Sequence, residues 1–99
     1  MDEKVTRQIN VELPEKESEG VYSNMAFIMT SPQEFIIDFA RIMPGLNKAK
    51  VYSRIIMTPA HAKMLHKTLE DNLKKYETDF GQIKVFGLEE KNIGFKQEK

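Results

Sequence analysis

The chain has 99 residues, of which 40% are hydrophobic and 30% charged, with 15 acidic and 15 basic side chains. This composition predicts one small globular domain and excludes a wholly disordered chain. Cysteine is absent, which excludes disulfides, thiolate metal sites and thiol nucleophiles. No apolar run approaches the ~20 residues that span a bilayer, and the charged N-terminus does not resemble a signal peptide, so we expect a cytoplasmic protein.

The charges are unevenly distributed along the chain. A net charge of zero argues against a purely electrostatic nucleic-acid binder. Between Phe39 and Leu69, however, there is no acidic residue, and the basic residues there are Arg41, Lys48, Lys50, Arg54, Lys63 and Lys67. Such a run can arise by chance in a short sequence, or it can indicate a basic surface with acidic flanks, which favours an anionic partner.

The first third of the chain predicts two strands. Residues 5–13 alternate with period two, and one side carries Val5, Arg7, Ile9, Val11 and Leu13. This pattern indicates a half-buried strand, which Pro14 ends because proline cannot donate to a ladder. Residues 15–20 predict a solvated loop. Residues 21–30 predict a second strand, in which neither side is properly polar.

Residues 31–43 allow two interpretations. The tetrapeptide SPQE at residues 31–34 suits a type I turn, and Phe35, Ile37 and Phe39 then follow with period two, as in a strand. The same tetrapeptide matches a capping box with proline at the first helical position, followed by apolar residues at helical spacing. We favour the strand, and Pro44 and Gly45 end the element in either case.

The remainder predicts one more strand and a helix. Residues 49–57 form the fourth predicted strand. Thr58 and Pro59 begin a helix, since threonine caps and proline fits the first turn, and Gly81 is the expected stop. The predicted fold class is therefore α+β: a four-stranded antiparallel sheet followed by one long C-terminal amphipathic helix, in a single domain over residues 1–87. Residues 83–86 predict a short strand or arm, and residues 88–99 a charged, mobile tail.

The predicted sheet is apolar on both faces. If Thr30 lies opposite Phe35, one face holds Ala26, Ile28, Ile37 and Phe39. The other face holds Met25, Phe27, Met29 and Ile36, with Asp38 as its main polar residue. One amphipathic helix can cover a single face, so we predict that those four apolar residues form the interface of a homodimer. The alternative is that residues 83–86 fold back over them.

Few residues in the sequence indicate a catalytic, metal-binding or phosphate-binding site. His61 and His66 are five residues apart and lie on different sides of a helix, unlike the i, i+4 pair of a metal site. Glu34 and Asp38 share a strand side, as an acid and a base could, but nothing else defines a pocket and Glu34 fits the turn. The five glycines are isolated, so there is no phosphate-binding loop. We predict a non-enzymatic protein without catalytic residues, metal or cofactor.

Nucleic-acid binding has more support. Tyr22, Tyr52 and Arg54 lie on predicted strands, and an aromatic ring beside cations can stack a base and hold its phosphate. The predicted site for single-stranded nucleic acid comprises Arg41, Lys48, Lys50, Tyr52 and Arg54. The alternative for these residues is that Tyr52 packs on the sheet and Arg54 pairs with Asp38. The alternative function is an interaction or assembly module whose apolar sheet face docks a protein partner.

Several segments together resemble a known family. These are VYSN at residues 21–24, SPQEF at 31–35 with Asp38 and Phe39, AKV at 49–51 with Arg54 and Ile55, and TPAHA at 58–62. Over roughly residues 5–81 the chain resembles domain of unknown function 3467, a prokaryotic family whose resemblance implies no established activity, cofactor or catalytic residue. The predicted topology alone is also similar to PUR-repeat and PC4-like single-strand binders, although fold does not imply function.

Overall fold

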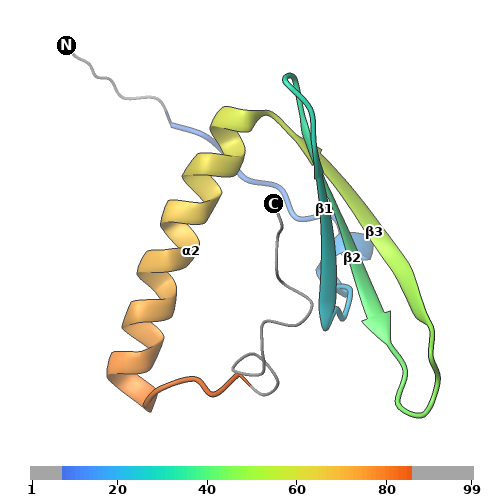
Figure 1. Cartoon of the computed structure of the whole chain (residues 1–99). Helices are drawn as coiled ribbons and strands as arrows, with labels where there is room; N and C mark the ends of the chain where they lie inside the picture. The colour runs from blue at the N-terminus through green and yellow to red at the C-terminus, as the bar shows by residue number, and fades with distance from the viewer. Residues whose placement is uncertain (1–7, 86–99) are drawn as a thin grey trace. The chain divides into compact units, whose positions relative to one another are not determined.

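The computed structural model describes residues 8–85. In chain order the elements are α1 (Glu15–Ser18), β1 (Met25–Thr30), β2 (Phe35–Ile42), β3 (Ala49–Met57) and α2 (Pro59–Phe80) (Figure 1). The chain falls into two units, with a boundary between Met57 and Thr58. The first unit contains the sheet and the second contains the long helix. Within residues 8–85, no helix is long and apolar enough to cross a membrane.

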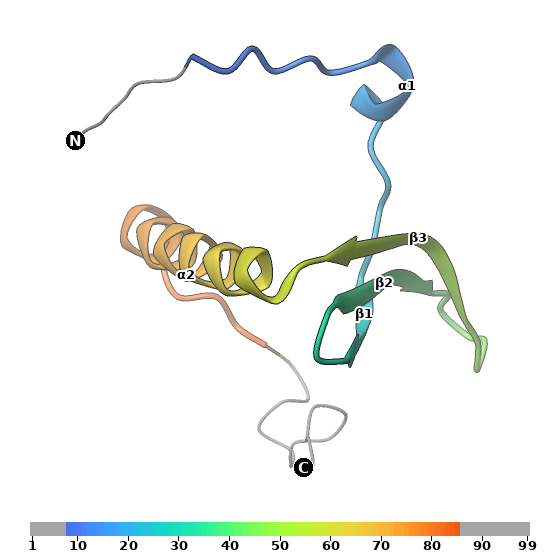
Figure 2. The same cartoon turned by 90° about the horizontal axis from the view of Figure 1, so that it is seen from above.

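The sheet is antiparallel, with strand order β1-β2-β3. Figure 2 shows the three strands side by side from a second direction. Thr30 lies opposite Phe35, Ile28 opposite Ile37 and Ala26 opposite Phe39, so the predicted register is confirmed. Residues 35–42 form a strand, which excludes the helical interpretation of that segment. The β-branched and aromatic residues there favour a pleated, half-buried surface.

Two short turns connect the strands. Ser31 N–H donates to Glu34 O at 2.9 Å, and Ser31 Oγ accepts from the backbone N–H groups of Gln33 and Glu34. Between β2 and β3, Leu46 N–H donates to Met43 O at 3.1 Å, and Gly45 has φ of 82°. A left-handed glycine at the third position after a proline at the second fits a type II turn.

The prediction of four strands is wrong. Residues 8–14 form no strand despite their alternating pattern, and residues 5–7 of that predicted strand lie outside the described residues. An alternating pattern shows that a segment suits a sheet edge, but a strand also needs a neighbour to pair its backbone groups. In the described part of the chain β1 pairs with β2 alone. The second strand also begins later than predicted, at Met25.

The three-stranded sheet removes the basis of the topological analogy to PUR-repeat and PC4-like proteins, which required four strands before the helix. The predicted loop at residues 15–20 contains a single helical turn, α1, whose Ser18 N–H donates to Pro14 O at 3.0 Å. Ile83 and Val85 lie in no strand. Phe86 and the predicted tail at residues 88–99 lie outside the described residues.

The predicted helix is confirmed with its caps. Thr58 Oγ1 accepts from His61 N–H at 3.1 Å, Pro59 is the first helical residue, and Gly81 follows the last one with φ of 100°. The 22 residues of α2 make a rod of about 33 Å. Its apolar residues recur every three or four positions and so share one side; they are Leu65, Leu69, Leu73, Tyr76 and Phe80.

Candidate functional site

The sheet has two faces, which its register defines, because residues directly opposite one another point to the same side. One face, here called the Asp38 face, carries Met25, Phe27, Met29, Ile36, Asp38, Arg54 and Ile56. The opposite face carries Ala26, Ile28, Thr30, Phe35, Ile37, Phe39, Ser53, Ile55 and Met57. Of residues 8–85 only Asp38, Ala40 and Met57 are buried, so both faces present apolar surface.

An ion pair lies in the middle of the Asp38 face. Arg54 donates to Asp38 through Nε at 2.6 Å and through Nη2 at 2.8 Å, which is a bidentate contact. The Arg54 hydrogen bonds lower the pKa of the Asp38 carboxyl below its ordinary value, and the same contact raises the pKa of Arg54. This pairing is the alternative considered for Arg54 from the sequence. The charge of Arg54 is therefore neutralised within the sheet.

The segment before β1 is attached to β2 by a side chain that imitates a backbone pair. Asn24 Oδ1 accepts from Ile42 N–H at 2.8 Å, and Asn24 Nδ2 donates to Ile42 O at 3.3 Å. Asn24 N–H also donates to Ala40 O at 3.0 Å. These contacts hold residues 22–24 alongside the end of β2. Tyr22 is thereby placed next to Arg41, although it lies outside β1.

A register shift in β3 displaces Tyr52. Phe39 lies opposite Ser53 and Ala40 opposite Val51, so Tyr52 has no partner on β2. Two residues against one is the pattern of a β-bulge, which bends a strand and redirects a side chain. Tyr52 lines an open hollow of about 280 Å³ together with Gly20, Val21, Tyr22 and Arg41.

Each tyrosine of this hollow carries a cation on its ring. The Arg41 guanidinium lies 5.4 Å from the centre of the Tyr22 ring, and the Lys50 ammonium lies 5.2 Å from the centre of the Tyr52 ring. Both distances are within the ~6 Å at which a cation is attracted to an aromatic face. We call Tyr22, Arg41, Lys50 and Tyr52 the tyrosine-cation cluster.

The two cations of the cluster come from opposed positions on neighbouring strands. Arg41 and Lys50 are direct cross-strand partners on β2 and β3. Like charges directly opposite on antiparallel strands are destabilising. The ion pairs among residues 8–85 are Arg54–Asp38, Lys67–Asp71 and Lys75–Asp79, so no described carboxylate pairs with Arg41 or Lys50. An anion held between the two side chains would relieve their repulsion.

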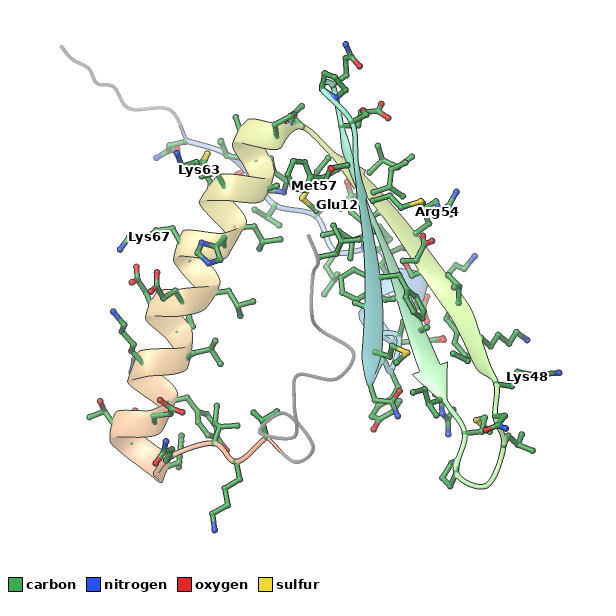
Figure 3. All side chains as sticks on the ribbon, viewed as in Figure 1. Glu12, Lys48, Arg54, Met57, Lys63 and Lys67 are labelled. Carbon is green, nitrogen blue, oxygen red and sulfur yellow. The ribbon has the colours of Figure 1, made fainter. Side chains whose placement is uncertain are left out.

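The structure thus brings together three of the five residues in the predicted nucleic-acid site: Arg41, Lys50 and Tyr52. It separates Arg54, which is engaged by Asp38. Lys48 precedes β3, and Figure 3 shows its side chain extending away from the sheet. Tyr22 belongs to the cluster but not to the predicted site. The contact between Asn24 and Ile42 places Tyr22 in the cluster, and no pattern among the neighbouring residues in the sequence predicts that contact.

The four residues of the predicted dimer interface do share a face. Met25, Phe27 and Met29 alternate along β1, and Ile36 lies opposite Met29. Phe27 is 47% exposed and Met29 is 49% exposed, whereas Met25 and Ile36 are half-buried.

The other residues considered for chemistry from the sequence do not come together. His61 and His66 are both exposed residues of α2. Asp38 engages Arg54, and Glu34 lies in the exposed turn. No group of three or more histidine or carboxylate side chains within residues 8–85 could hold a metal ion.

The comparisons with known proteins point to one family. The sequence matches the family described as "Protein of unknown function (DUF3467)" over residues 1–85. No match was found among curated proteins or among solved structures. The match spans most of the 99 residues and includes the sheet, the Asp38–Arg54 pair, the tyrosine-cation cluster and α2. The chain therefore belongs to the DUF3467 family.

Proposed function

We propose that this protein is a non-enzymatic cytoplasmic protein that binds single-stranded nucleic acid at the tyrosine-cation cluster. The observation that carries the proposal is the pairing of Arg41 directly against Lys50 with a tyrosine beside each. A phosphate between the two cations would neutralise the repulsion of their side chains. A base flanking that phosphate would stack on the ring of Tyr52 or Tyr22.

The hollow is small and open to the surface. Its volume of about 280 Å³ lies below the ~300–1,000 Å³ of enclosed small-molecule sites. An open surface hollow suits an unstacked base that enters edge-on, while its phosphates remain at the rim. A duplex keeps its bases stacked inside, so stacking on the tyrosines favours a single strand over a duplex.

A fluorescence-anisotropy titration with a single-stranded oligonucleotide tests this proposal. If Arg41 and Lys50 each neutralise one phosphate, log K falls with log salt at a slope of about −1.4. Affinity should then drop about sevenfold between ~50 mM and ~200 mM salt. The duplex of the same sequence should bind more weakly. Absence of binding at ~50 mM salt would refute the proposal.

A second proposal concerns assembly, and the two apolar faces of the sheet favour it. We propose that the protein is a homodimer that buries Met25, Phe27, Met29 and Ile36. A single helix can cover one face at most, and each large apolar side chain removed from water contributes about 1.5–3 kcal/mol. Light scattering tests the dimer directly. A protein that stays monomeric would refute the homodimer, and a protein partner of different sequence would then be the occupant of this face.

A further inference from the structure

Among residues 8–85 the outer edge of β1 is unpaired, and it lacks the features that normally prevent one sheet edge from pairing with another. Its six residues, MAFIMT, contain no charge, no proline and no glycine, and its pairing with β2 is regular over all six. Natural proteins protect edges with lysines, prolines, bulges or a covering element. The other edge, β3, has three of these protections: Lys50, Arg54 and the bulge at Tyr52. The β1 edge is therefore the one suited to pairing.

The register shows which backbone groups the β1 edge offers. Ser31 N–H donates to Glu34 O across the turn, so residues 31 and 34 form a hydrogen-bonded pair. Such pairs alternate along an antiparallel ladder. Residues 29, 27 and 25 therefore direct their N–H and C=O groups toward β2. The N–H and C=O groups of Ala26, Ile28 and Thr30 point outward from the sheet.

We propose that the β1 edge pairs antiparallel with β1 of a second copy, about a two-fold axis at Ile28. Ile28 then lies opposite its own symmetry mate, and Ala26 lies opposite Thr30 of the second copy. The two sheets become one sheet of six strands. The proposal rests on the proposed homodimer but places the contact between the copies at the β1 edge. Met25, Phe27 and Met29 of both copies then lie on one continuous face of the six-stranded sheet.

The polarity of β1 favours a second copy of itself over the alternating segment at residues 8–13. Residues 8–13 also alternate, and Ile9, Val11 and Leu13 are 68–88% exposed. Their other side, however, carries Gln8, Asn10 and Glu12. Docked on β1, that side would set polar and charged groups beside an apolar strand on one face of the sheet. A second β1 matches on both faces, and its lack of charge avoids repulsion across the two-fold axis.

The absence of cysteine from the sequence allows a cross-linking test without background. In the proposed pair, residue 28 faces its mate at about 5.5 Å between Cα atoms, which lies within the range of a disulfide. The variant Ile28→Cys should form a covalent dimer on mild oxidation. Ala26→Cys is the matched control on the same side of the strand: four residues separate it from its mate, or more than ~13 Å, so it should not cross-link.

A second variant weakens the pairing without a covalent bond. Ala26→Pro removes an outward N–H and leaves the ladder to β2 intact, since a strand edge tolerates proline there. Each dimer loses two hydrogen bonds, so the dimer dissociation constant should rise about tenfold or more. Circular dichroism checks that the variant stays folded.

The outcomes separate the two proposals. A wild-type protein that remains a monomer at high concentration overturns both the homodimer and the edge contact. If the protein is a dimer, but Ile28→Cys does not cross-link and Ala26→Pro does not weaken it, the edge contact alone is overturned and a dimer packed face to face remains. Cross-linking of Ile28→Cys but not of Ala26→Cys, with a weakened Ala26→Pro dimer, supports the edge contact.

Discussion

The two edges of the sheet differ in charge and in shape. β1 is short, uncharged and regular, whereas β3 is longer, carries Lys50 and Arg54, and is bent at Tyr52. A regular uncharged edge can accept another strand, and a bulged basic edge resists strand pairing. The same bulge places an aromatic ring in a surface hollow. The difference teaches that, if the two proposals hold, one small sheet would use a regular edge for assembly and the bulge of another strand for ligand binding.

The largest expected effect is on the tyrosine-cation cluster. Replacing both rings, Tyr22→Ala with Tyr52→Ala, removes two stacking surfaces worth ~1–3 kcal/mol each, so oligonucleotide affinity should fall at least about 30-fold. Tyr76→Ala on α2 is the control, since that ring contacts Phe80 at 4.9 Å between ring centres and lies outside the cluster. Anisotropy titration measures both variants. Equal affinity of the double variant and the wild type would show that the oligonucleotide does not bind at the tyrosine-cation cluster.

Asn24 links the cluster to the β1 end of the sheet. Asn24→Ala leaves the exposed Ile42 backbone groups to water instead of the side-chain amide, so the free energy of unfolding should fall by about 0.5–1.5 kcal/mol. Oligonucleotide affinity should fall as well, because Tyr22 loses its attachment. Asn47→Ala, in the exposed loop before β3, is the matched control and should be nearly neutral. Urea unfolding measures both; a neutral Asn24→Ala would contradict this role for the amide.

The cations of the cluster should control the salt dependence. Arg41→Gln with Lys50→Gln should reduce the slope of log K against log salt by about 1.4, if each contacts one phosphate. Lys63→Gln with Lys67→Gln removes the same charge from α2, where Figure 3 shows both side chains on one side of the helix. That control should leave the slope close to the wild-type value. Equal slopes in the two double variants would indicate a diffuse charge effect.

The smallest effect concerns the Asp38 face and pH. Because Arg54 lowers the pKa of folded Asp38, the pair stabilises the fold above the ordinary aspartate pKa of about 3.9, and this stability is lost as pH falls through the lower folded pKa. Asp38→Asn should therefore show a shallower loss of thermal stability below about pH 4 than the wild type. Asp71→Asn, on exposed α2, is the control. If wild type and Asp38→Asn lose thermal stability equally in acid, the stabilising role of the Asp38–Arg54 pair is contradicted.

The sequence predicted the elements whose ends are specified by neighbouring residues, such as helix caps and tight turns. Thr58 and Pro59 marked the start of α2, and Gly81 its end, because caps act within one turn. The register of β1 and β2 followed from the turn at residues 31–34. That turn was also the source of the ambiguity. Ser31 Oγ accepts from Glu34 N–H, as a helix cap would, yet the chain continues as a strand.

The features that the sequence could not predict depend on contacts between distant residues. The alternation at residues 8–13 is real, but no local feature decides whether a neighbouring strand is present to pair with it. The bulge at Tyr52 leaves the alternating pattern of β3 unchanged in sequence and appears only in its register with β2. The Asn24–Ile42 contact spans 18 positions. These last two features decide which residues meet in the tyrosine-cation cluster.

Amide hydrogen exchange of the wild-type protein tests the difference between the edges most directly. The outward N–H groups of β1 belong to Ala26, Ile28 and Thr30, and by the same alternation those of β3 include Arg54 and Ile56. Pairing in solution slows exchange at the first three and leaves the last two fast. The predicted result is slow exchange at Ala26, Ile28 and Thr30 and fast exchange at Arg54 and Ile56. Exchange as fast at those three as at Arg54 and Ile56 would contradict an edge paired with a second copy.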